Sequence, residues 1–234
     1  MENLSEEIKK EHNSKYNFIL YIVVFLVIIL FSFVLWPIMR ERHNLDQIKI
    51  TFIEGSTNED IVKLLSNRIP NFNKDVFLND PRSKQGYLFP DTYFFLPITN
   101  TDEVLNMMTL NFTKRVSPLD QDIKSSGKSL KDIIIMASIL EKEASGKEDI
   151  SIISGILWKR IRVGIPLQVD IAPTTYKESG LTEKPINNPG LRAIKAAIHP
   201  VETSYLFYLH DRDGKVHYAV NFNEHKSNIT KYLK

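Results

Sequence analysis

One long apolar run near the N-terminus is the most distinctive pattern in the chain. Residues 18–36 read FILYIVVFLVIILFSFVLW and contain one small polar residue, Ser32. As a helix, this run is about 28 Å long, which matches the hydrocarbon core of a bilayer. A cleaved signal peptide is the alternative, but its apolar part is shorter and small residues follow it, whereas Pro37 and Arg40 follow here. The pattern predicts an uncleaved transmembrane helix.

The charges on either side of this run do not determine its orientation. Three basic residues stand on each side: Lys9, Lys10 and Lys15 before it, and Arg40, Arg42 and Lys49 after it. The positive-inside rule compares such counts, and here they are nearly equal. The topology therefore has to come from other evidence.

Beyond residue 46, some segments have apolar residues at every second position, as in strands, and others have them at helical spacing. Alternation predicts three strands, over 47–53, 205–209 and 216–221. The last two strands flank Asp211-Arg212-Asp213-Gly214, a typical hairpin turn. The polar stretch 71–84 is predicted to be a loop with a short helix.

Three segments with helical spacing are each preceded by a residue that is favoured at the N-cap of a helix. Thr57, Asn100 and Ser129 each precede such a segment, and Glu103 follows Asn100 as in a capping box. The helix after Ser129 is predicted over 130–144, with Gly146 as its stop. Further helices are predicted over 148–163, 191–198 and 224–233. Together these segments predict an α+β fold.

Composition excludes several classes of protein. The chain has no cysteine, so disulfides, thiolate zinc sites, iron–sulfur clusters and cysteine nucleophiles are excluded. A formal net charge of +2 argues against non-specific nucleic-acid binding. His199, His217 and His225 lack the spacing of a helical metal-binding pair, so a metal-dependent hydrolase is a disfavoured alternative.

The stretch MASILEKEAS, residues 136–145, is the strongest candidate for chemistry. On a helical wheel, Glu141 and Glu143 fall about 80° to either side of its apolar stripe. Partial desolvation there would raise the pKa of a carboxyl group toward the range of a general acid. Periodicity does not choose between the two glutamates, and a solvated helix end is the alternative.

Two further stretches admit two interpretations each. The aromatic-rich GYLFPDTY, residues 86–93, fits either a packed strand or a platform for sugars. PLQVD at 166–170 and NNPG at 187–190 carry amides and a carboxylate, which suit hydrogen bonds to sugar hydroxyls. The same residues suit tight turns equally well.

In order and spacing, these stretches resemble the endolytic murein transglycosylase family (YceG-like). The similarity extends over about Ile48 to Lys234, after a single membrane anchor as in the family. The matching stretches are GYLFPDTY (86–93), MASILEKEA (136–144), GIPLQVD (164–170), TTYKESGLTEKPINNPG (174–190), AAIHP (196–200) and the closing hairpin with His217.

The resemblance implies a membrane-anchored lytic transglycosylase, a lyase without a cofactor or metal. Such an enzyme cuts nascent peptidoglycan glycan strands internally at the β-1,4 bond from N-acetylmuramic acid to N-acetylglucosamine. It leaves 1,6-anhydro-muramyl ends and terminates glycan elongation. The resemblance implies Glu143, the second glutamate of EKE, as the catalytic residue. It also implies a glycan cleft lined by Tyr87, Phe89, Asp91, Gln168, Asp170 and Asn188.

The resemblance also implies an organisation and partners. The expected parts are a cytoplasmic tail (1–17), a transmembrane helix (18–36), an abbreviated LysM-like strand–helix unit (46–80) and an extracytoplasmic YceG-like catalytic domain (81–234). The expected partners are peptidoglycan glycan strands, the membrane and cell-wall synthases, but no nucleic acid.

The chain departs from the family pattern at three places. Gln85 replaces a common glutamate, Ile171 replaces a proline, and the segment between PLQVD and TTYKESGL is reduced to 171–173. In the family this longer segment helps to build the substrate groove. The shortening favours an alternative function, that of a catalytically weak or inactive peptidoglycan-binding scaffold in a cell-wall synthesis complex.

Overall fold

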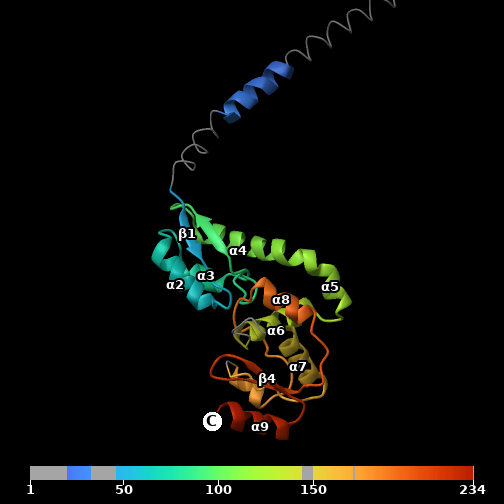
Figure 1. Cartoon of the computed structure of the whole chain (residues 1–234). Helices are drawn as coiled ribbons and strands as arrows, with labels where there is room; N and C mark the ends of the chain where they lie inside the picture. Colours follow the sequence, from blue (N-terminus) through green and yellow to red (C-terminus); the bar gives the residue numbers. More distant parts are fainter. Residues whose placement is uncertain (1–19, 33–45, 144–149, 171, 234) are drawn as a thin grey trace, which may run out of the picture. The chain divides into compact units, whose positions relative to one another are not determined.

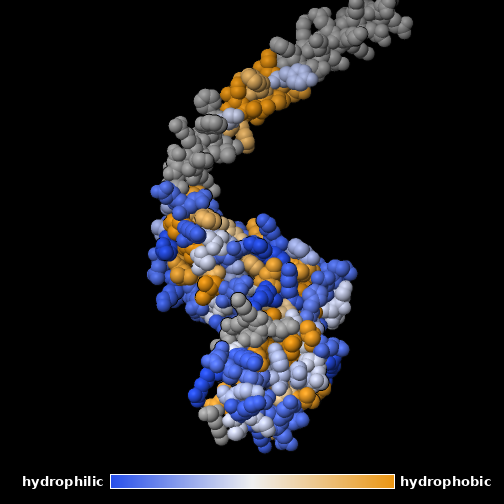
Figure 2. Space-filling model, viewed as in Figure 1, coloured by the Kyte–Doolittle hydropathy of each residue, from blue (hydrophilic) through white to orange (hydrophobic). Residues whose placement is uncertain are grey.

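The computed structural model describes residues 20–32, 46–143, 150–170 and 172–233. The chain divides into two units, 1–47 and 48–234, which we describe separately. In the first unit, residues 20–32 form a helix whose side chains are exposed and apolar (Figures 1 and 2). Within the described part of the chain, no helix combines the length and apolarity needed to cross a bilayer. The predicted transmembrane helix extends past the described residues at both ends, and the predicted tail lies outside them.

The second unit is α+β, as predicted. Its elements in chain order are β1 (Ile48–Thr51), α2 (Asn58–Arg68), α3 (Lys74–Asn79), β2 (Thr92–Phe95), α4 (Thr101–Val116), α5 (Asp120–Ser125), α6 (Leu130–Glu143), α7 (Ile150–Arg162), α8 (Leu191–Ile198), β3 (Phe207–His210), β4 (Val216–Ala219) and α9 (Phe222–Tyr232). Short 3₁₀ turns occupy Ser117–Leu119 and Pro173–Tyr176. Figure 1 shows β1 and α9 at opposite ends of this unit.

The predicted helix caps are present. Thr57 and Asn100 form capping boxes with Asp60 and Glu103. The hydroxyl of Ser129 accepts the N–H of Asp132 at 3.1 Å, which satisfies a free donor at the start of α6. The predicted stop at Gly146 and the predicted start at Glu148 lie outside the described residues.

The described strands form two small antiparallel sheets. The hairpin β3–β4 is the predicted one, and it pairs Leu209 with His217. In the other sheet β1 pairs with β2, and Ile50 faces Tyr93. The alternation of polar and apolar residues in β1 predicted a strand. It did not predict the partner strand, which lies about forty residues further along the chain.

Two hydrophobic clusters stabilise the second unit. The first contains buried side chains of β1, α2, α3, β2 and α4, from Ile50 to Met108. It therefore continues beyond the predicted boundary between residues 80 and 81, and the assignment of a LysM-like unit stays a prediction. The second cluster surrounds α6, whose residues from Ile133 to Leu140 are all buried. The helices α7 and α8 pack against α6 and leave its two ends near the surface.

Candidate active site

The C-terminal end of α6 carries both glutamates of the EKE stretch. The helix is buried from Ile133 to Leu140, whereas Glu141 and Glu143 are half-buried and Lys142 between them is exposed. This is the arrangement that the helical wheel predicted. Burial raises the pKa of both carboxyl groups above the usual value for glutamate. Both glutamates therefore have the electrostatic property of a general acid, and their hydrogen bonds distinguish them.

Glu141 has a structural partner. Its Oε2 accepts the backbone N–H of Gly190 at 2.8 Å, and Gly190 is the N-cap of α8. The carboxylate therefore satisfies a free donor at the start of a helix, where the helix dipole favours negative charge. Glu141 thereby fixes α8 against α6.

Glu143 instead accepts a hydrogen bond from the side chain of a tyrosine on another element. The hydroxyl of Tyr208, on β3, donates to Glu143 Oε2 at 2.7 Å. Burial is the main cause of the raised pKa of Glu143, and the negative charge of Asp170 adds to it. The hydrogen bond from Tyr208 and electrostatic interactions with His210 and Arg160 oppose this rise in the pKa of Glu143. The half-buried acid on α6 therefore interacts with groups from three other segments of the chain.

Arg160 holds these segments together. It lies on α7 and is only 5% exposed. Its Nε donates to the carbonyl of Leu206 at 2.7 Å and its Nη1 to the carbonyl of Leu167 at 2.6 Å. Its guanidinium also lies 5.1 Å from the ring centre of Phe207. One buried cation therefore connects α7 to the PLQVD loop and to the strand that carries Tyr208.

Gln168 and Asp170 lie on a tight turn, and the charge of Asp170 acts on Glu143. The backbone N–H of Gln168 donates to the carbonyl of Thr175 at 3.0 Å, and Tyr176 donates its hydroxyl hydrogen to Asp170. Both predicted site residues have exposed side chains. Gln168 has a φ of 54°, which is uncommon for a residue other than glycine. Strained backbone of this kind is frequent at functional sites.

The GYLFPDTY stretch packs partly against α4. Tyr87 is half-buried, and its ring centre lies 5.1 Å from that of Phe112. Asp91 accepts hydrogen bonds from Arg115 at 2.7 Å and from Asn111 at 3.1 Å. Phe89 is 5% exposed and belongs to the core around α6. Core packing is therefore the correct interpretation for Phe89, while Tyr87 keeps an open face.

Asn188, like Phe89, is a predicted site residue that the structure withdraws from solvent. It is 1% exposed. Its Oδ1 accepts the N–H groups of Gly86 and Leu88, and its Nδ2 donates to the carbonyl of Ser56 and to Oδ1 of Asn58. These four bonds use the whole hydrogen-bonding capacity of the amide. The prediction that Asn188 binds glycan is therefore replaced by a structural role.

Comparison with known proteins identifies the family. The model of the YceG-like family matches residues 35–174 and 174–231, which is most of the chain. The chain belongs to the YceG-like family. A putative YceG-like protein from Listeria monocytogenes has the same fold, with a TM-score of 0.72 at 22% identity over 81% of this chain and 78% of that one.

Relatives of this YceG-like protein include two proteins named endolytic murein transglycosylase. The relative from Bacillus subtilis is 30% identical over 203 residues, which are 75% of this chain and 56% of the relative. The relative from Streptococcus pneumoniae D39 is 28% identical over 177 residues, 64% of this chain and 32% of the relative. The YceG-like chain thus spans between about a third and about half of the length of these relatives.

Sequence reasoning missed three residues of this site in the YceG-like chain. Tyr208 was predicted only as part of a hairpin strand, His210 lies one residue beyond that predicted strand, and Arg160 falls within the predicted helix 148–163 without an assigned role in the site. One signal was available for Arg160. It stands four residues after Ile156 and three after Leu157, on the buried face of α7. A cation on an apolar face indicates a buried partner.

Proposed function

We propose that this YceG-like protein is a membrane-anchored lytic transglycosylase that cuts peptidoglycan glycan strands internally. The observation that carries the proposal is the half-buried Glu143, whose pKa is raised by burial and whose Oε2 accepts a hydrogen bond from Tyr208. The names of the two relatives support the same reaction class.

A single acid suffices for this reaction because the sugar supplies its own nucleophile. In the proposed step, protonated Glu143 donates its proton to the glycosidic oxygen, and the bond from the muramyl C1 to that oxygen breaks. The C6 hydroxyl oxygen of the same muramyl residue then bonds to C1, and its proton passes to Glu143. The acid is restored, no water is consumed, and the product is a 1,6-anhydro ring. Most glycoside hydrolases, in contrast, need a second carboxylate as base or nucleophile.

The groups around Glu143 have proposed roles in this step. Tyr208 holds Oε2, which leaves Oε1 to carry the transferred proton. Asp170 is exposed and close enough to raise the pKa of Glu143. Its negative charge would also stabilise the positive charge that develops at C1. Asp170 is the predicted glycan contact whose charge acts on Glu143, Gln168 stands two residues before it on the same turn, and Arg160 is a positioning residue.

The Tyr208→Phe variant should work at higher pH than the parent. Without the hydroxyl, the carboxylate form of Glu143 loses a stabilising hydrogen bond, so its pKa rises further. A general acid must be protonated to act, so the alkaline limb of the pH–rate profile should shift upward by about one pH unit. Tyr205→Phe is the matched control, because Tyr205 is a nearby tyrosine whose ring instead stacks on that of Tyr218, with the ring centres 5.1 Å apart. An unchanged alkaline limb in Tyr208→Phe would contradict the role of this hydrogen bond.

The membrane part of the proposal places residues 18–36 in the bilayer, 1–17 in the cytoplasm and the second unit outside. The apolar described helix over 20–32 and the location of the glycan outside the membrane support it. Because the chain has no cysteine, single cysteines report the topology cleanly. A membrane-impermeant maleimide should label Lys215→Cys in intact protoplasts and Ser5→Cys only after permeabilisation. The reverse labelling would reject this topology.

The reaction is tested by its products. The purified full chain, in detergent, is incubated with uncrosslinked glycan strands, and new ends are identified by mass spectrometry. Internal fragments with 1,6-anhydro-muramyl ends are the expected result. Binding of strands without new ends would instead support the scaffold alternative, which the short segment at 171–173 favours. Reducing ends formed with water would show a hydrolase and contradict the proposed step.

A further inference from the structure

A groove of about 890 Å³ lies at the other end of α6 from Glu143. It is formed by the start of α2, the loop 81–87, α4, the start of α6 and the loop 183–185. Tyr87 and Phe112 give it an aromatic wall, with their ring centres 5.1 Å apart. All these segments belong to the second unit, and nothing in the proposed reaction uses the groove.

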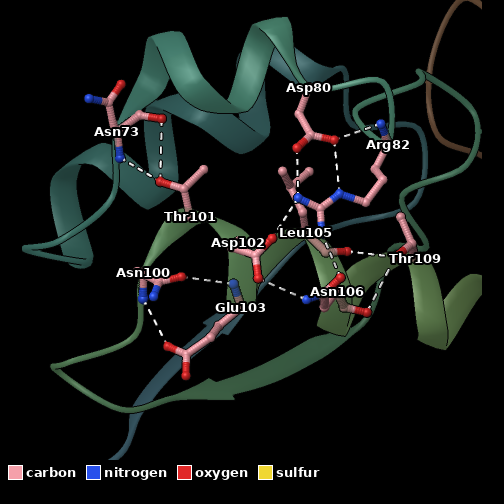
Figure 3. Close-up of polar contacts among 10 residues, drawn as sticks. All are labelled: Asn73, Asp80, Arg82, Asn100, Thr101, Asp102, Glu103, Leu105, Asn106 and Thr109. Atoms are coloured by element: carbon pink, nitrogen blue, oxygen red, sulfur yellow. Dashed lines mark hydrogen bonds and ion pairs between the residues drawn. The ribbon is translucent and has the colours of Figure 1, made fainter.

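One cation of the groove is already neutralised. Arg82 donates to Asp80 at 2.6 and 2.9 Å, to Asp102 at 2.7 Å and to Asn106 at 2.6 Å (Figure 3). Hydrogen bonds and charge from Asp80 and Asp102 raise the pKa of Arg82 above its usual value. This network fixes the loop 80–82 against α4. Arg82 therefore shapes the wall of the groove and is not available to a ligand.

Five other charged side chains line the groove and are exposed. Three are cationic, namely Lys84, Lys131 and Lys184, and two are anionic, namely Glu59 and Glu183. Within the described residues, none of the five takes part in an ion pair. The groove thus offers unpaired charges of both signs beside an aromatic wall. This combination suits a short peptide that bears carboxylates and an amine, because each charge can find an opposite one.

The groove cannot hold the sugar that reacts. Lys131 stands in the first turn of α6 and Glu143 at its last residue, so about 18 Å of helix separates them. A ligand that uses both places must therefore be a polymer of several sugars. Peptidoglycan has this form, since each muramyl residue of a nascent strand carries a short peptide with carboxylates and an amine.

We propose that this groove binds the peptide stem of a muramyl residue several sugars away from the bond that is cut. The proposal rests on the proposed function, since it assumes a glycan strand at Glu143. Its consequence is a preference for strands that still carry their peptides. Glu59 and Glu183 would pair with the amine of the stem, and the three lysines with its carboxylates.

Binding to the full chain in detergent tests the groove separately from the reaction. The Glu143→Gln variant is titrated with uncrosslinked strands and with the same strands after an amidase has removed their peptides. We expect about tenfold weaker binding of the stripped strands, since three modest ion pairs together amount to about that factor. The triple variant K84A/K131A/K184A, which also carries Glu143→Gln, should bind intact and stripped strands equally. Its affinity should be that of the Glu143→Gln chain for stripped strands.

A matched triple variant controls for net charge. K114A/K195A/K215A removes the same charge from exposed positions outside the groove and should keep the preference for peptide-bearing strands. Equal binding of intact and stripped strands by the Glu143→Gln chain would overturn the proposal. Inorganic polyphosphate that displaces intact strands from the parent but not from the groove variant would also overturn it, because the groove would then be a general anion site. The absence of anhydro products from the parent chain would reject the proposed reaction. The difference in binding between intact and stripped strands could still be measured.

Discussion

Replacing Glu143 with glutamine should lower the rate of anhydro-end formation by about 10²-fold or more. Glutamine keeps the shape of the side chain and can still accept the hydroxyl hydrogen of Tyr208, but it cannot donate a proton to the leaving oxygen. The loss of a general acid typically costs this much. The rate is measured with the full chain by mass spectrometry of the released ends, under conditions where strand binding is saturated.

Glu141→Gln is the matched control for this prediction. The two glutamates are two residues apart, both are half-buried, and burial raises the pKa of both. Glutamine at 141 can still accept the N–H of Gly190, so the contact between α6 and α8 is kept. We expect a change of less than about threefold in the rate, as for a residue outside the chemistry. Activity that is kept in Glu143→Gln and lost in Glu141→Gln would move the catalytic role to Glu141.

Asn188→Ala should lower the free energy of unfolding by about 2–4 kcal/mol. The substitution leaves the buried N–H groups of Gly86 and Leu88 without an acceptor, and the carbonyl of Ser56 without one of its donors. Unsatisfied buried groups typically cost about 1–3 kcal/mol each, and local relaxation recovers part of this. Chemical denaturation of the full chain, followed by circular dichroism, measures the difference.

The kinetics of the same variant separate the structural role from glycan binding. Below its melting temperature, Asn188→Ala should keep the kcat and KM of the parent within about twofold, since the amide does not reach solvent. A raised KM without a loss of stability would restore the original prediction that Asn188 contacts glycan. Asn223→Ala, at an exposed position of α9, is the control and should change stability by less than about 0.5 kcal/mol.

The parts of the fold that local chemistry determines were predictable from the sequence. Caps at Thr57, Asn100 and Ser129 mark helix starts because a side-chain oxygen satisfies a nearby N–H, and both groups lie within four residues. The hairpin around Gly214 follows from a turn whose residues are adjacent. The half-buried position of Glu141 and Glu143 follows from helical period alone.

Contacts between distant segments were not predictable in this way. The pairing of β1 with β2, the bond from Tyr208 to Glu143 and the four bonds of Asn188 each join residues more than forty positions apart. A strand pattern shows that a segment seeks a partner, but it does not identify the partner. Family resemblance selected Glu143, and it also suggested Asn188, because a motif does not distinguish residues that bind a ligand from residues that hold the loops beside it.

The hydrogen bond between Tyr208 and Glu143 has a consequence for the stage of synthesis at which Glu143 reaches its final environment. A ribosome makes α6 before the last third of the chain, so the acid exists well before β3. During synthesis, the nascent polypeptide would carry a carboxyl group with ordinary acidity, because β3, which contacts Glu143 through Tyr208, has not yet emerged. The raised pKa of Glu143 would then arise only when the C-terminal hairpin folds onto α6, which under the proposed topology means after export of the second unit.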